Sequence, residues 1–123
     1  MTRLPILVVD DDHAASSALV AIVNSRGTLA DAAHDLTTAL ALVAQRDYAL
    51  AILDYEMPEV DGLEFFARLR QVRADLPGVM FTGVVTPELL TRATDAGFLH
   101  VLWKPAELDE LLAIVESHSS AGP

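Results

Sequence analysis

Residues 6–13 read ILVVDDDH, in which four aliphatic side chains are followed directly by three aspartates. The apolar run predicts a short buried β-strand, and the carboxylates follow at its carboxyl end. Two carboxylates about 4 Å apart repel each other by roughly 4 kcal/mol at an effective dielectric constant near 20. The cluster must therefore be exposed, protonated or neutralised by a cation.

Asp12 has a structural explanation. Aspartate is a favoured N-cap residue, and the sequence HAASSALVAIV that follows predicts a helix. In this interpretation the cluster is a solvated turn in which one aspartate caps the helix. It leaves Asp10 and Asp11 unexplained, so partners for these two carboxylates must be sought elsewhere along the chain.

The composition limits the classes of protein to which the chain can belong. With 123 residues, of which 52% are hydrophobic, it is long enough for one domain with a sizeable core. Its formal net charge of −10 argues against direct binding to nucleic acid or to an anionic membrane surface, because both require basic patches. The chain contains no cysteine, which excludes a disulfide framework and a thiolate metal site.

The amino-terminal sequence MTRLPILVVDDD reaches charged residues after too short an apolar stretch for a signal peptide. No apolar run approaches the length of a membrane span. We therefore expect a cytoplasmic protein without a membrane partner.

Short apolar runs alternate along the chain with longer segments of helical periodicity. The runs YALAIL and PGVMFT lack polar alternation, as expected for buried parallel strands. Strands are predicted at residues 5–9, 28–32, 49–53, 78–82 and 99–103, and helices at about 12–25, after Asp35, from about Asp61, from Thr86 to Gly97 and at 106–117. Five βα units in a row predict an α/β fold with a doubly wound, five-stranded parallel sheet. We place this domain at residues 1–118 and expect residues 119–123 to form a flexible tail.

Polar side chains stand where the predicted strands end. Asp10 and Asp11 follow the first strand, Asp54 follows the third, Thr82 ends the fourth and Lys104 follows the fifth. In open α/β sheets the ligand site lies beyond the carboxyl ends of the strands, at the point where the strand order reverses. We therefore expect three carboxylates, a hydroxyl and an ammonium group to converge at one edge of the sheet.

This set of groups has a coherent chemistry. Carboxylates with an open position suit Mg²⁺, which keeps several waters and binds through one or two carboxylates together with phosphate oxygens. Aspartate also serves as a phosphoryl nucleophile, and a lysine can balance charge on the remaining phosphoryl oxygens. The constellation therefore indicates a Mg²⁺-dependent phosphoryl site. The alternative is an ordinary salt bridge between Lys104 and Asp54, with Thr82 as an inert strand-end residue.

Four motifs, ILVVDDD, AILDYEMPEVDGLEF, VMFTG and LWKP, occur in an order and spacing that resembles the receiver domain of response regulators, the phosphoacceptor module of two-component signalling. The resemblance spans nearly the whole chain. It implies a flavodoxin-like (βα)5 fold with strand order 2-1-3-4-5. It also implies a signalling domain, not a dedicated enzyme, that takes a phosphoryl group from a phosphohistidine on a histidine kinase or a histidine phosphotransfer protein and signals by changing its conformation.

The same resemblance implies which residues accept the phosphoryl group and bind the metal. Asp54 is the implied phosphoacceptor. Asp10 and Asp11 form the implied acidic pocket, with Asp11 as a direct Mg²⁺ ligand. Asp54 itself and the backbone carbonyl of Glu56 complete the implied metal site.

Two further residues are expected to contact the phosphoryl group. By the resemblance, Thr82 hydrogen-bonds this group and moves inward when it arrives, and Lys104 contacts one of its oxygens. The Lys104–Pro105 peptide bond is expected to be cis, as the family's usually is. Gly62 is expected where the loop after Asp54 turns into the third helix, and Gly83 matches a small residue that leaves room for the phosphoryl donor.

The fifth strand departs from the family pattern. Many receivers have a tyrosine or phenylalanine three residues before the lysine, where it swings inward as the hydroxyl residue moves, but this chain has Val101. A valine cannot sweep the same volume, so the usual aromatic switch is in doubt. By strand alternation Trp103 shares a face with Val101, and we expect its indole near the fourth and fifth helices.

Two rival functions remain. The pair Asp10-x-Asp12 after an apolar strand also resembles the nucleophile motif of haloacid-dehalogenase-like phosphatases, which likewise use a strand-end threonine or serine and a lysine. Those enzymes need a further acidic motif after the lysine, but this chain has only ELDELL there, on a predicted helix. The phosphatase interpretation would also leave the LDYEMPEVDG segment without a role. The other rival is a pseudo-receiver, a binding module with the fold but without phosphorylation. The presence of all the phosphorylation residues argues against it.

Overall fold

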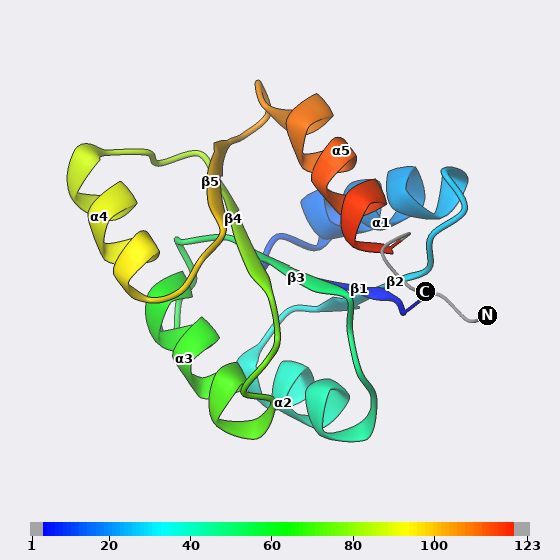
Figure 1. Cartoon of the computed structure of the whole chain (residues 1–123), viewed down its shortest axis with the longest axis horizontal. Coiled ribbons are helices and arrows are strands. Elements are labelled where there is room, and N and C mark those ends of the chain that lie inside the picture. Colours follow the sequence, from blue (N-terminus) through cyan, green and yellow to red (C-terminus); the bar gives the residue numbers. More distant parts are fainter. Residues whose placement is uncertain (1–3, 120–123) are drawn as a thin grey trace.

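The chain alternates strands and helices along its whole described length. A computed structural model describes residues 4–119 (Figure 1). The elements in chain order are β1 (Ile6–Val9), α1 (His13–Ser25), β2 (Ala30–Ala33), α2 (Leu36–Gln45), β3 (Leu50–Leu53), α3 (Gly62–Val72), β4 (Gly78–Thr82), α4 (Pro87–Asp95), β5 (His100–Trp103) and α5 (Leu108–Ser119).

All five strands join one parallel sheet in the order β2-β1-β3-β4-β5. This is the doubly wound, flavodoxin-like order expected from the sequence, so that prediction is confirmed. β1 and β3 end in register, because Val9 pairs with Leu53, and β4 and β5 end in register two residues further on, because Leu53 pairs with Met80 and Thr82 pairs with Trp103. The residues that follow the strands therefore emerge at one edge of the sheet.

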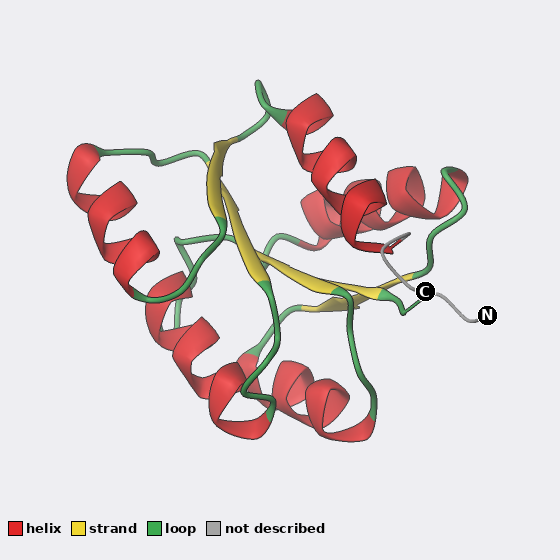
Figure 2. Ribbon diagram, viewed as in Figure 1, coloured by secondary structure: helices red, strands yellow, loops and turns green. Residues whose placement is uncertain are grey.

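Helices cover both faces of the sheet and so bury alternate residues of each central strand. Helices α1 and α5 lie on one face, and α2, α3 and α4 lie on the other (Figures 1 and 2). In β1, Ile6 and Val8 pack with residues of α1 and α5, while Leu7 and Val9 join the core beneath the other three helices. Burial on both sides explains why this strand is a continuous apolar run.

The four predicted helix starts are confirmed by their caps. Each capping side chain accepts a hydrogen bond of 2.7 to 3.1 Å from the backbone N–H three residues further along, which satisfies one of the free donors of the first turn. The capping residues are Asp12, Asp35, Asp61 and Thr86.

The last helix lies two residues later than predicted, beginning at Leu108 and ending at Ser119. It starts late because residues 104–107 form a separate turn, closed by a 2.8 Å hydrogen bond from the Glu107 N–H to the Trp103 carbonyl. It ends late because Ser119 is buried and its hydroxyl accepts a hydrogen bond from the buried Thr28 hydroxyl. Ser119 thus belongs to the helix rather than to the expected tail, and residues 120–123 of that tail lie outside the described residues.

Within residues 4–119, none of the helices has both the length and the apolar character needed to cross a membrane.

Candidate functional site

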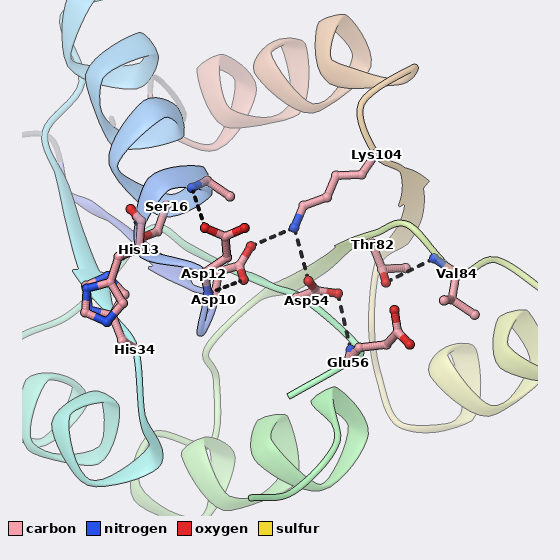
Figure 3. A network of polar contacts seen from close by, with 11 residues as sticks. Asp10, Asp12, His13, Ser16, His34, Asp54, Glu56, Thr82, Val84 and Lys104 are labelled. Atoms are coloured by element: carbon pink, nitrogen blue, oxygen red, sulfur yellow. Dashed lines mark hydrogen bonds and ion pairs between the residues drawn. The ribbon is translucent and has the colours of Figure 1, made fainter. Parts of the chain in front are cut away.

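Three of the predicted site residues meet at the carboxyl edge of the sheet (Figure 3). Asp10 follows β1, Asp54 follows β3 and Lys104 follows β5. The Lys104 Nζ lies 2.6 Å from Asp10 Oδ2 and 3.1 Å from Asp54 Oδ2. One ammonium group therefore bridges two carboxylates and offsets the repulsion that the aspartate cluster would otherwise suffer.

The bridge is largely shielded from solvent. The side chains of Asp10, Asp54 and Lys104 are 8%, 14% and 24% exposed. Burial alone would lower the pKa of Lys104, but the hydrogen bonds that it donates to Asp10 and Asp54 outweigh the burial and raise that pKa above its usual value of 10.5. Lys104 is therefore protonated and positively charged at neutral pH.

Backbone groups hold the two carboxylates in place. Asp10 Oδ1 accepts a 3.0 Å hydrogen bond from the N–H of Asp12, and Asp54 Oδ1 accepts one of 3.2 Å from the N–H of Glu56. Each carboxylate thus has one oxygen held by the following loop and the other directed to Lys104. The side chain of Glu56 is exposed and contributes nothing to this anchoring.

Gly62 lets the start of α3 pack directly beneath the phosphoacceptor candidate. Its N–H donates a 2.8 Å hydrogen bond to the carbonyl of Tyr55. A Cβ atom at this position would lie 2.9 Å from the Tyr55 Cα and still closer to the carbonyl oxygen of Asp54. Glycine is therefore required at the junction of this loop and α3, which is where Gly62 was expected from the sequence. At Gly83, by contrast, an added Cβ would meet nothing within 4 Å.

Thr82 lies at the same edge but outside the lysine bridge (Figure 3). It is fully buried, and its hydroxyl oxygen accepts a 3.3 Å hydrogen bond from the N–H of Val84. Its carbonyl accepts a 2.8 Å hydrogen bond from the N–H of Lys104. Thr82 therefore anchors the backbone of the lysine, and its hydroxyl is tied to the loop that leads into α4. The Lys104–Pro105 bond is cis, as expected.

Asp11 is the predicted site residue that the structure does not bring into the cluster. Its side chain is exposed and takes part in none of the hydrogen bonds or ion pairs formed among residues 4–119. Over the same range, no three His, Cys, Asp or Glu side chains are arranged to hold a metal ion as they stand. Two convergent carboxylates nevertheless fit Mg²⁺, because this ion takes one or two carboxylates and completes its shell with water.

Sequence reasoning missed a group of residues beside the pocket. Ser16, which is buried, donates to the carbonyl of His13 at 3.2 Å and lies 2.8 Å from His34 Nε2. The rings of His13 and His34 stack with centroids 3.6 Å apart. Ser16 also lines a cavity of about 20 Å³, bounded in addition by Asp10, Asp54, Lys104 and Phe81, with room for about one water molecule. Residues 21 positions apart in different elements give no sequence signal for such a stack.

The geometry bears on the two alternative interpretations of the site. The ordinary salt bridge between Lys104 and Asp54 is too simple, because the ammonium group also pairs with Asp10 at a shorter distance. In the phosphatase interpretation Asp12 would act with Asp10. Its side chain instead caps α1 through the N–H of Ala15, at 3.1 Å.

The sheet order and the acidic pocket at its carboxyl edge are those of a receiver-type signalling domain. The chain belongs to the response regulator receiver domain family, whose model matches residues 6–116. Receivers of this family are signalling modules and not dedicated enzymes, so the phosphatase interpretation is not supported. Response regulators pair with histidine kinases, and the family generally uses Mg²⁺ for phosphorylation.

The curated relatives that the chain matches include mycobacterial response regulators. It is 37% identical over 120 residues to the transcriptional regulatory protein TcrA of Mycobacterium tuberculosis, a match that covers 96% of this chain and 47% of that protein. It is 38% identical over 108 residues to the response regulator MprA of Mycobacterium ulcerans, covering 88% of this chain and 47% of MprA. The chain therefore spans about half the length of the curated relatives that it matches.

Solved structures share the whole fold. A response regulator receiver protein from Pseudomonas putida superposes with a TM-score of 0.88 at 28% identity, covering 95% of this chain and 98% of the other. The chemotaxis protein CheY4 of Vibrio cholerae gives a TM-score of 0.85 at 25% identity, covering 94% and 98% of the two chains. The fold described above is thus the CheY-like fold.

Proposed function

We propose that Asp54 is the phosphoacceptor of this receiver and that it takes its phosphoryl group from a phosphohistidine on a histidine kinase or a histidine phosphotransfer protein. The observation that supports this role is the bridge in which Lys104 joins Asp54 to Asp10. Asp54 is the carboxylate that directly follows the central strand β3, and it is partly open to solvent. A donor therefore reaches it from the carboxyl edge of the sheet.

The transfer is a displacement at phosphorus. A carboxylate oxygen of Asp54 attacks, the new O–P bond forms as the P–N bond to the donor histidine breaks, and the departing imidazole nitrogen takes up a proton. The Lys104 ammonium group already contacts Asp54, so its positive charge can compensate for the negative charge of the incoming phosphoryl oxygens. The Thr82 hydroxyl is placed to hydrogen-bond the phosphoryl group once it leaves its present position by the Val84 amide.

Asp10, Asp11, Asp54 and the backbone carbonyl of Glu56 would hold a Mg²⁺ ion. When bound, this ion offsets the negative charge of the carboxylates and of the transferred group. Asp10 and Asp54 already converge, whereas the exposed side chain of Asp11 must turn inward to join them. Lys104 then exchanges one of its two carboxylate partners for phosphoryl oxygens.

We further propose that the domain works in the cytoplasm, where a kinase presents its phosphohistidine, and that its partners are proteins and not nucleic acid. The net charge of −10 supports the second part of this proposal, because a nucleic-acid surface needs the opposite sign. Phosphorylation passes a signal by changing the conformation around Thr82 and the loop before α4.

Labelling with acetyl phosphate and Mg²⁺ tests the proposed role. Stable incorporation that disappears in Asp54→Asn is the expected result, because this substitution is nearly isosteric but removes the nucleophile. Asp12→Asn is a matched control from the same cluster, since asparagine also caps helices and the label should persist. Labelling of Asp54→Asn to the wild-type level would refute the assignment of Asp54 as the phosphoacceptor. Rapid turnover to free phosphate would indicate an enzyme, and no labelling at all would indicate a pseudo-receiver.

A further inference from the structure

The turn that follows β5 is closed by Glu107 in two ways. Its carboxylate oxygen Oε1 accepts a 2.8 Å hydrogen bond from the N–H of Trp103. Its own N–H donates a 2.8 Å hydrogen bond to the carbonyl of Trp103. The two bonds form a clasp around the Trp103 peptide groups, and Lys104 lies within the closed turn.

The clasp is made at the free edge of the sheet. Strand β5 lies at the end of the sheet and pairs with β4 alone among the described strands. On that side the N–H of Lys104 donates a hydrogen bond to the carbonyl of Thr82, the last residue of β4. The N–H of Trp103 donates to Glu107 instead. Glu107 therefore provides on the open side of β5 a partner that a further strand would otherwise supply.

The clasp also joins β5 to the helix that follows. The carbonyl of Glu107 accepts a 3.1 Å hydrogen bond from the N–H of Leu111, in the first turn of α5. Leu111 is fully buried in the core between the sheet and α5. The turn is thus fixed by its bond to a helix that is packed in the core, and not by the edge strand alone.

Lys104 needs this support because its target lies far across the sheet. Asp54 follows β3, two strands away from β5, and Asp10 follows β1, three strands away. Neighbouring strands lie about 4.8 Å apart, so the Lys104 side chain must extend across more than one strand spacing, and its reach depends on where its backbone stands. A shift of the turn changes the span that the side chain must cover to make its two contacts, which are 2.6 and 3.1 Å long.

We propose that Glu107 is the positioning residue for Lys104, and that its clasp on Trp103 sets where the ammonium group stands relative to Asp10 and Asp54. The consequence for phosphorylation rests on the proposed function, whereas the effect on the position of Lys104 does not. Glu107 touches neither carboxylate and acts only through the turn.

Four variants separate the clasp from charge and from general stability. Glu107→Ala removes the accepting oxygen, and Glu107→Asp keeps the charge but shortens the side chain by one methylene so that it falls short of the Trp103 N–H. Glu107→Gln retains an accepting oxygen at the same reach without the charge. Glu110→Ala is the matched control, because it removes an exposed acid from the first turn of the same helix. Amide hydrogen exchange should show the Trp103 N–H exposed in the Ala and Asp variants at position 107 while the other strands stay protected.

Lys104 is the only lysine of the chain, so lysine-selective ¹³C labelling reports on this side chain by NMR without interference. We expect the Lys104 Cε and Hε resonances to move toward those of a free lysine in Glu107→Ala and Glu107→Asp. They should stay at the wild-type position in Glu107→Gln and Glu110→Ala. Unchanged resonances in both Glu107→Ala and Glu107→Asp would overturn the proposal, as would an equal displacement in Glu107→Gln.

A double-mutant cycle with Lys104→Ala measures whether Glu107 acts through the lysine. The rate of labelling by acetyl phosphate should fall by roughly tenfold in Glu107→Ala, the factor that corresponds to weakening one charge-assisted hydrogen bond. In the Lys104→Ala background the same substitution should change the rate by less than about twofold. A full additional tenfold loss there would overturn the proposal. If Lys104→Ala itself does not slow labelling, the role of the lysine in the proposed function fails, while displaced resonances still support the positioning by Glu107.

Discussion

Asp10 and Lys104, 94 residues apart in sequence, form an ion pair of 2.6 Å at the carboxyl edge of the sheet. Asp10 is almost completely buried, and the lysine reaches it from the far edge strand. The ammonium group therefore offsets part of the negative charge of the acidic pocket before any metal or phosphoryl group arrives. Of the three acids that follow the apolar strand in ILVVDDDH, Asp10 is thus paired with a residue near the other end of the chain, Asp12 caps α1 and Asp11 is exposed to solvent.

The first prediction concerns the stability of this pocket. Lys104→Met leaves the carboxylates of Asp10 and Asp54 without their shared cation, and we expect the free energy of unfolding at pH 7 to fall by about 1–3 kcal/mol. Adding Mg²⁺ should recover part of the loss, because it supplies the missing positive charge. Urea unfolding with and without Mg²⁺ measures both effects. Arg68→Met, which breaks an exposed pair with Glu64, is the control and should change stability by less than about 1 kcal/mol. Equal losses in the two variants would contradict the prediction.

The second prediction concerns the junction of the acceptor loop with α3. Gly62→Ala places a methyl group against the backbone of Asp54 and Tyr55, so we expect a loss of about 1–3 kcal/mol in stability together with slower acetyl phosphate labelling. Gly83→Ala is the matched control, since its methyl group meets nothing within 4 Å and the fold should be unaffected. Denaturant unfolding and labelling rates test both variants. A Gly62→Ala protein as stable and as reactive as the wild type would show that the close approach is not required.

The third prediction concerns the alkaline limit of stability. Burial and a 2.7 Å hydrogen bond to Asp31 raise the pKa of the Tyr48 phenol above its usual value of 10.0. Because the folded-state pKa lies above the unfolded one, this phenol stabilises the fold fully below pH 10, and the contribution is lost as the pH rises toward the folded-state pKa. The difference in phenolate absorbance between wild type and Tyr48→Phe should therefore titrate above pH 10. A difference that titrates at or below that pH would count against the buried hydrogen bond.

Much of the fold could be predicted from local sequence signals. Apolar runs such as YALAIL predict buried strands, and a cap such as Asp61 or Thr86 defines where its helix begins, because both depend on neighbouring residues only. The convergence of Asp10, Asp54 and Lys104 followed from the topology, since parallel strands end at one edge.

The remaining features depend on side-chain contacts between distant elements. The stack of His13 on His34 joins α1 to the end of β2, and no periodicity links the two positions. Helix α5 starts late because Glu107 closes a turn on Trp103, and local helix propensity does not predict this contact. The outward position of Asp11 is likewise a matter of side-chain orientation, which the pattern of three aspartates leaves open.

The fourth prediction concerns the lifetime of the phosphorylated state. The Glu56 side chain is exposed beside Asp54, while its backbone N–H holds Asp54 Oδ1. Substitutions at Glu56 should keep the backbone bond and leave stability within about 0.5 kcal/mol of the wild type. They should change the rate of dephosphorylation severalfold, because a carboxylate exposed beside Asp54 can orient the water that attacks the aspartyl phosphate. Decay of the label in Glu56→Ala, Glu56→Asn and Glu56→Lys measures this effect, and decay at the wild-type rate in all three would refute it.

The last prediction uses the only tryptophan of the chain, Trp103, as a reporter on β5. The residue is 55% exposed, so it does not belong to the core, and its peptide groups are held by Glu107 next to Lys104. Val101, half-buried against the core beneath α2, α3 and α4, cannot make the large inward swing of an aromatic side chain.

We therefore predict that movement of β5 in this protein begins at the lysine. We expect that, when a phosphoryl group or its mimic is present on Asp54, Lys104 turns from the Asp54 carboxylate to the new oxygens and the clasped turn transmits this shift to Trp103. Beryllofluoride with Mg²⁺ should then change the tryptophan emission of the wild type, and Asp54→Asn should abolish the change. Glu107→Ala should weaken the change, because it opens the clasp. If the emission stays constant while fluorine NMR shows the mimic bound, β5 does not take part in the response, and the signal leaves the site through Thr82 and the loop before α4.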